Sequence, residues 1–358
     1  MALLKNLFLS LTSIFLMTGL SSCYQEFEPD IPSVPVLCMN SEITAGEPII
    51  LFLTRTWRWS EENQFSIDVD VTDAEVKLFV NGDLRETLDP GTIINEYYPS
   101  NPYPEIRKCF KGDYIPRSGD MIRIEASSPQ YGDAWAEVRV PEEVPIDRIE
   151  IQDASCEAWG DTSTFPVVEE ECNFNLRFRM LVYFTDRDTP GDYYDLALNA
   201  SPYSDYDGEA DAILYNAWPD FSGESLFSEH VSVLESAVAE TSGYTIFSDR
   251  SINGKTYPLR IKFTDSMFIY KNPLDLDGPK EYGLVVSLRH VDEAYYKHVI
   301  SLWETNDAIV GSLSGVGLAN AVYPYSNVST GAGVVAAYTS SKMTLPMADV
   351  VMAAQKKN

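Results

Sequence analysis

A large apolar side chain at every second position from residue 174 to residue 184 constrains the fold more than any other feature. Every second residue there is large and apolar: Phe174, Leu176, Phe178, Met180, Val182 and Phe184. Successive side chains of a β-strand point to opposite faces of the sheet, so this spacing predicts a strand with one buried face. We therefore expect an all-β fold, mainly β in content, whose core is built from such faces.

Shorter alternating runs precede this strand and predict a first domain. Residues 74–80 and 84–88 flank Asn81 and Gly82, which tolerate positive φ, so a tight hairpin is expected between them. Further strands are expected at residues 34–39, 48–54, 121–126 and 134–140. In the last of these, Trp135 is expected to face outward. Short strands without helical spacing predict an immunoglobulin-like β-sandwich over residues 36–141.

A larger β-rich domain is predicted for residues 142–345. Pro141 and Pro145 mark its start, and strands are expected at residues 146–152, 174–184, 193–199, 257–264 and 282–288. One segment has helical spacing instead, since Tyr296, Val299, Ile300 and Trp303 follow Asp292, a residue type that caps helix N-termini. At least one helix is therefore expected to pack on a sheet, and residues 346–358 are interpreted as a tail.

The first 22 residues have the composition of a signal peptide. Lys5 precedes an apolar stretch, and small residues come directly before Cys23. The stretch is too short for a transmembrane anchor and lacks charges on its far side. The segment Leu20-Ser21-Ser22-Cys23 resembles the lipobox of bacterial lipoproteins. We predict that residues 1–22 are removed, that Cys23 is lipidated, for example with palmitate, and that residues 23–35 form an acidic, proline-containing tether to the membrane.

The acidic residues after Cys23 and the net charge of the chain indicate where the protein is located and which partners it can bind. Glu26, Glu28 and Asp30 resemble the surface-export signal of Bacteroidota lipoproteins, although a solvated tether is the other interpretation. We expect a lipid-anchored protein on the outer face of the outer membrane, with the periplasmic face as the alternative. The formal net charge of −28 disfavours a nucleic-acid partner.

Cysteines and acidic turns supply candidate covalent and metal sites. Cys156 and Cys172 bracket an acidic segment between two predicted strands and form the predicted disulfide, while the pairing of Cys38 and Cys109 is left open. Asp205, Asp207 and Asp211 surround a glycine and make a weak calcium candidate, with a solvated turn as the alternative. No other cofactor is predicted.

Two groups of aromatic side chains are candidates for partner binding. Trp57 and Trp59 lie at the end of a predicted strand, and Tyr97, Tyr98 and Tyr103 lie in a proline-stiffened loop that we expect to project. Rigid aromatic side chains suit protein contacts and sugar stacking alike, although packing between domains is the alternative. No sequence motif for a nucleophile, a zinc protease or a phosphate loop occurs, so an enzyme is not predicted.

Several segments together indicate a family. The late segment 323–335 places Pro324 and Asn327 before a glycine-rich turn and a final strand. Earlier pieces are residues 73–76, residues 184–186 followed by Tyr193 and Tyr194, Asp249 with Asn253 and Gly254, and residues 295–303. In this order they resemble the Bacteroidota outer-membrane lipoprotein family known as domain of unknown function 4249, over nearly the whole mature chain. Residues 38–40 and Val335 depart from the usual pattern of that family.

The resemblance implies a cellular context. Such lipoproteins are commonly found with TonB-dependent outer-membrane receptors. The leading functional hypothesis is therefore a non-catalytic surface lipoprotein that assists a TonB-dependent transporter in nutrient uptake. The alternative is a surface glycan- or host-binding module that resembles an adhesin. The nutrient, the identity of the partner and the oligomeric state are left open.

Overall fold

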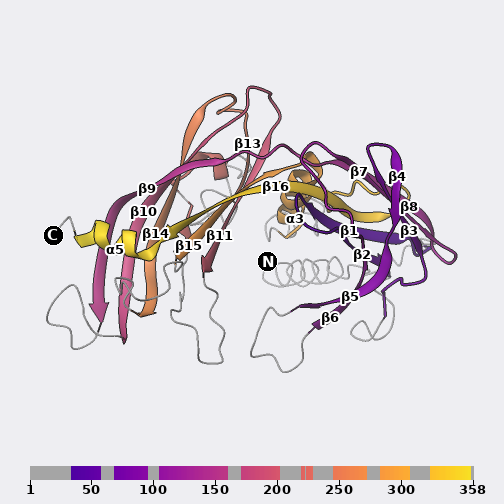
Figure 1. The fold of residues 1–358 in the computed structure, drawn as a ribbon, viewed down its shortest axis with the longest axis horizontal. Helices are drawn as coiled ribbons and strands as arrows, with labels where there is room; N and C mark the ends of the chain where they lie inside the picture. The colour runs from indigo at the N-terminus through magenta and orange to yellow at the C-terminus, as the bar shows by residue number, and fades with distance from the viewer. Residues whose placement is uncertain are drawn as a thin grey trace, which may run out of the picture. The chain divides into compact units, whose positions relative to one another are not determined.

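Strands dominate the computed structural model of the chain (Figure 1). The structure describes residues 34–57, 68–95, 105–159, 171–201, 219–221, 223–228, 245–271, 283–306 and 323–355. Residues 35–358 form one compact unit, separate from residues 1–34. The predicted all-β fold is confirmed. In the described part of the chain, no helix is long and apolar enough to cross a membrane.

The described strands form three sheets. The largest has the order β13 (Ile246–Ser248), β11 (Tyr193–Ser201), β15 (Gly283–Val291), β16 (Ala332–Pro346), β1 (Leu37–Thr44), β2 (Ile50–Arg55), β6 (Glu105–Lys111) and β5 (Asp89–Asn95). A second contains β4 (Asp83–Thr87), β3 (Glu75–Val80), β7 (Met121–Ser128) and β8 (Gly132–Arg139). The third contains β12 (Pro219–Asp220), β14 (Thr256–Lys271), β10 (Glu171–Thr185) and β9 (Ile146–Trp159).

One hydrophobic core lies under the strands of the N-terminal region. Its buried side chains alternate along β3, β7 and β8, as the sequence predicts, and pack against those of β1 and β2. The predicted hairpin is also present, because Val80 pairs with Asp83 and both Asn81 and Gly82 have positive φ. Two facing sheets with inward apolar residues make this region sandwich-like.

A second core lies between β9, β10 and β14 on one side and β11 and β15 on the other. The apolar side chains at every second position of β10 contribute to it, since Phe178, Met180, Val182 and Phe184 are all buried there. Phe178 stacks on Phe263 of β14, with ring centroids 4.6 Å apart.

Strand β16 contributes to both cores and connects them. It pairs in parallel with β1 and antiparallel with β15, and Figure 1 shows it beside both. Val335 and Ala337 belong to the first core, whereas Leu345 belongs to the second. At Gly333, φ is +93°, and a Cβ would overlap the carbonyl oxygen of Met39. Glycine is thus required where the two strands begin to pair.

Two α-helices flank β16 in sequence. Helix α3 (Glu293–Asn306) begins after Asp292, whose carboxylate accepts hydrogen bonds from the backbone N–H groups of Ala294 and Tyr295, as predicted for an N-cap. The same carboxylate accepts a bond from Ala337 N and so ties the helix to β16. Helix α5 (Met347–Gln355) lies in the segment interpreted as a tail, and it buries Val350 and Ala354 in the second core.

Candidate functional site

Most residues singled out in the sequence as candidate sites lie outside the part of the chain that the structure describes. These are Cys23, Trp59, Tyr97, Tyr98, Tyr103, Asp205, Asp207 and Asp211. Trp57 is described, and its side chain is 46% exposed just beyond the end of β2.

The strands around the tyrosine loop are described. β5 and β6 form a hairpin in which Asn95 pairs with Glu105, so residues 96–104 connect its two strands. β2 is antiparallel to β6. The end of β2 that leads to Trp57 therefore lies at the same end of the sheet as the start of β6.

The predicted disulfide partners lie on neighbouring strands. Cys156 of β9 pairs with Leu176 of β10, and Cys172 lies four residues away from Leu176 along β10. That offset corresponds to about 13 Å along a strand, whereas the Cα atoms of a disulfide are about 4–7 Å apart. This backbone register does not favour the bridge. The side chains of both cysteines lie outside the described residues, so the pairing stays a prediction.

Three buried aspartates come together at one end of the second core. Asp186 follows β10, Asp192 precedes β11 and Asp249 follows β13, and one carboxylate oxygen of each lies within 4.8 Å of the others. Asp186 and Asp249 belong to the segments that carried the family resemblance. Segments distant in sequence are therefore brought together at one polar centre.

Hydrogen bonds from the protein occupy this centre. Asp186 accepts bonds from the hydroxyl of Tyr194 and from Gly254 N, and Asp249 accepts one from Gly191 N at 2.8 Å. Asp192 accepts two bonds from the guanidinium of Arg187, at 2.9 and 2.7 Å. Nε2 of His290 also lies 3.3 Å from Asp192, while its Nδ1 lies 2.6 Å from the carbonyl oxygen of Glu142.

Burial and charge act on these groups in different directions. Burial raises the pKa of Asp186, and its hydrogen bonds do not fully offset that effect. Burial also pushes the pKa of Asp192 upward, but hydrogen bonds from His290 and Arg187 outweigh it and lower the pKa to about 2. The pKa of Tyr194 lies far above its ordinary value because the hydroxyl is buried and donates to Asp186.

The aspartate centre is the one group of clustered carboxylates, among the described residues, whose spacing suits a metal ion. Each carboxylate already accepts bonds from protein donors that belong to the loops around it. The network fixes the loop between β10 and β11 against the turn at residues 249–255. We interpret it as a structural connection between loops.

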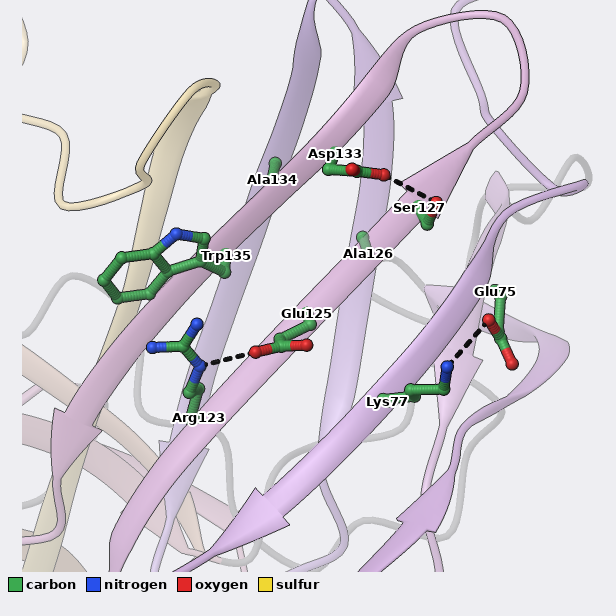
Figure 2. Close-up of a pocket in the computed structure, with 9 residues that line it drawn as sticks. All are labelled: Glu75, Lys77, Arg123, Glu125, Ala126, Ser127, Asp133, Ala134 and Trp135. Atoms are coloured by element: carbon green, nitrogen blue, oxygen red, sulfur yellow. Dashed lines mark hydrogen bonds and ion pairs between the residues drawn. The ribbon is translucent and has the colours of Figure 1, made fainter. Parts of the chain in front are cut away.

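An exposed pocket lies on the outward face of the sheet β4-β3-β7-β8 (Figure 2). Its volume is about 370 Å³, and its lining residues come from three neighbouring strands: Glu75, Lys77, Arg123, Glu125, Ala126, Ser127, Asp133, Ala134 and Trp135. The opposite face of the same strands is buried in the first core. The pocket is therefore built on a rigid support.

Strand register arranges the outward-facing lining residues in three rows across the sheet. Lys77, Glu125 and Trp135 occupy one row of directly paired positions, and Glu75, Ser127 and Asp133 occupy the next. Neighbouring strands lie about 4.8 Å apart and neighbouring rows about 7 Å apart. Cations, carboxylates, a hydroxyl and an indole thus face solvent within a small area.

Arg123 reaches from a third row to the indole of Trp135. Its guanidinium carbon lies 3.8 Å from the ring centroid, and its Nε donates a 2.7 Å hydrogen bond to Glu125. Figure 2 shows this arginine between the carboxylate and the ring. The outward orientation of Trp135 was predicted from the alternation of β8, but the pocket was not. Adjacent outward-facing charged residues on β3 and β7 were the missed signal.

Comparison with known proteins places the chain in a family. No curated protein and no solved structure matches it. One family model matches residues 24–344, and its description is Domain of unknown function (DUF4249). The match covers most of the chain, including all three sheets and the segments that meet at the buried aspartates. The chain therefore belongs to the DUF4249 family.

Proposed function

We propose that this chain is a non-catalytic lipoprotein on the outer-membrane surface that assists a TonB-dependent transporter in nutrient uptake. The start of the family match carries the proposal, because the matched region begins at residue 24, directly after Cys23. Cleavage at the lipobox-like segment would remove the residues before Cys23 and leave the entire matched region behind the lipid anchor. The partner class follows from the family resemblance of the sequence.

Binding is the activity that such an anchored β-rich protein can supply. Attachment to a membrane confines the protein near membrane partners and raises their effective concentration, so a weak contact can give a lasting complex. The end of β2, next to Trp57, lies at the same end of the sheet as the ends of β5 and β6 that precede and follow residues 96–104. Exposed Trp57 and Ile106, at 46% and 63%, supply apolar surface there.

Affinity recovery from cells tests the partner. We expect a tagged chain, extracted in mild detergent, to recover a TonB-dependent receptor in comparable amount. Tyr97→Ala, Tyr98→Ala and Tyr103→Ala combined should reduce that recovery about tenfold or more, because aromatic anchors contribute most of the energy of a typical interface. Tyr323→Ala is the matched control, since Tyr323 is a 79% exposed tyrosine outside the hairpin.

Three outcomes would change the proposal. Unchanged recovery of the receptor by the triple variant would move the interface elsewhere on the molecule and keep the role. Recovery of no receptor, even after crosslinking in cells, would overturn the transporter role and favour the glycan- or host-binding module. A Cys23→Ala variant that still partitions with membranes would contradict the lipid anchor.

A further inference from the structure

The Trp135 surface has the size and groups of a small-ligand site, and we infer that it binds carbohydrate. This surface comprises the lining residues shown in Figure 2. A volume of about 370 Å³ lies at the lower end of the range for small-molecule sites and suits one or two sugar rings. The inference is independent of the transporter role and concerns a different part of the molecule from the β5–β6 hairpin.

Trp135 supplies a fixed aromatic surface. Its side chain is 37% exposed, and its backbone is paired on both sides, with Glu125 of β7 and with Ser329. The Ser329 pairing contains a 2.8 Å bond from Ser329 N to the Trp135 carbonyl. Arg123 stacks on the indole and restricts its rotation. A ring already held in place loses little entropy when a ligand packs on it.

Polar groups beside the ring suit hydroxyls that both donate and accept. Arg123 donates to Glu125 through Nε, and its side chain is 32% exposed beside the indole, so its guanidinium also offers N–H donors to a ligand. Ser127 donates a 2.6 Å bond to one carboxylate oxygen of Asp133, and Lys77 pairs with Glu75 at 2.9 Å. Carboxylate acceptors therefore alternate with N–H donors, and vicinal hydroxyls of a sugar can bridge such neighbours.

The charge balance selects a neutral ligand. Two cations and three carboxylates line the pocket, and the cations are paired with carboxylates. An anionic ligand would meet the carboxylates of a chain that already carries a charge of −28, and a metal ion would have to displace the paired cations. A protein partner would need about 800 Å² of surface, more than a pocket of this size provides. A neutral polyol needs no net charge in the pocket and no large contact area, so it fits this surface best.

Titration of the mature lipoprotein with defined sugars tests the inference. The protein is held in a detergent that lacks a sugar head group, and maltose, cellobiose and mannobiose are followed by saturation-transfer NMR and calorimetry. At least one disaccharide should bind. Trp135→Ala should weaken that binding about tenfold or more, and Lys77→Ala should weaken it several-fold. Thermal unfolding of each variant verifies that it folds. If Trp135→Ala does not fold, the effect of Lys77→Ala on sugar binding tests the inference by itself.

Arg148→Ala provides the matched control. Arg148 pairs with Glu150 at 2.8 Å and stacks 3.6 Å over Tyr183, so it repeats the arrangement of Arg123 on another sheet. Its removal should leave sugar binding unchanged. No binding of any of the three disaccharides, or equal binding by wild type and Trp135→Ala, would overturn the inference. A Trp135→Ala variant that loses receptor recovery while no sugar binds would identify the pocket as a protein contact instead.

Discussion

The buried aspartate centre and the Trp135 surface contain similar groups in opposite surroundings. At the centre, Asp192 is 8% exposed and accepts bonds from Arg187 and lies against His290. At the surface, Arg123 and Glu125 form a comparable pair with exposures of 32% and 39%. In the first place the protein's own donors hold buried carboxylates, whereas in the second the paired groups are partly exposed to water. Satisfied polar groups hold a fold together, and outward-facing ones are available to a ligand.

The largest loss of stability is expected when the buried charge of Asp192 is removed. Asp192→Asn leaves Arg187 and His290 without their carboxylate, and we expect a loss of about 2–4 kcal/mol in the free energy of unfolding. Urea denaturation measures it. Asp188→Asn is the control, because Asp188 is exposed on the same loop and should change stability by less than about 0.5 kcal/mol. Equal urea midpoints for the two variants would show that the network does not stabilise the fold.

Acid should reduce the stability that the ionised carboxylate of Asp192 contributes to the fold. The pKa of Asp192 is lowered to about 2 in the fold, so its ionised form adds stability above the unfolded-state value near 3.8. That stability, about 2 kcal/mol, is lost as pH falls from roughly 4 to 2. The neighbouring Asp186 has a raised pKa and acts in the opposite sense. Unfolding measured from pH 5 to 2 should be less pH-dependent for Asp192→Asn, and parallel curves would contradict this assignment.

The smallest effect is expected at the surface. Glu125→Gln removes the partner of Arg123 while keeping the size of the side chain. An exposed ion pair contributes about 0–1 kcal/mol, so the urea midpoint should move little. A loss as large as that of Asp192→Asn would mean that the pocket is part of the structural framework, and the contrast between the two regions would disappear.

Features set by nearby residues were predictable from the sequence. The Asn81-Gly82 hairpin, the buried face of β10 and the cap at Asp292 all depend on residues a few positions apart, where turn chemistry and side-chain period act directly. The presence of a helix after Asp292 and the outward direction of Trp135 follow from the same rules.

Features that join distant segments were not predictable in this way. The aspartate centre assembles loops around residues 186, 192 and 249, and no spacing rule relates them. The parallel pairing of β1 with β16 was also not predictable, because alternation identifies strands but does not show which strands pair with each other. Helix α5 was missed because its run of apolar residues lacks a polar face, although Val350 and Ala354 stand at helical spacing and are both buried.

The pairing of β1 with β16 also determines when the first core can finish folding during synthesis of the chain. The side chain of Asn40 accepts a hydrogen bond from Val334 N across 294 residues of sequence. The 294 residues that separate Asn40 from Val334 must be translated before the two strands can pair, so the first core lacks Val335 and Ala337 until β16 has been made. During that interval the edge of β1 that β16 will cover stays unpaired, and an unpaired strand edge is prone to misdirected pairing. Under the export that we propose, the same delay would keep the chain fit for translocation, because its fold cannot close before β16 has been made.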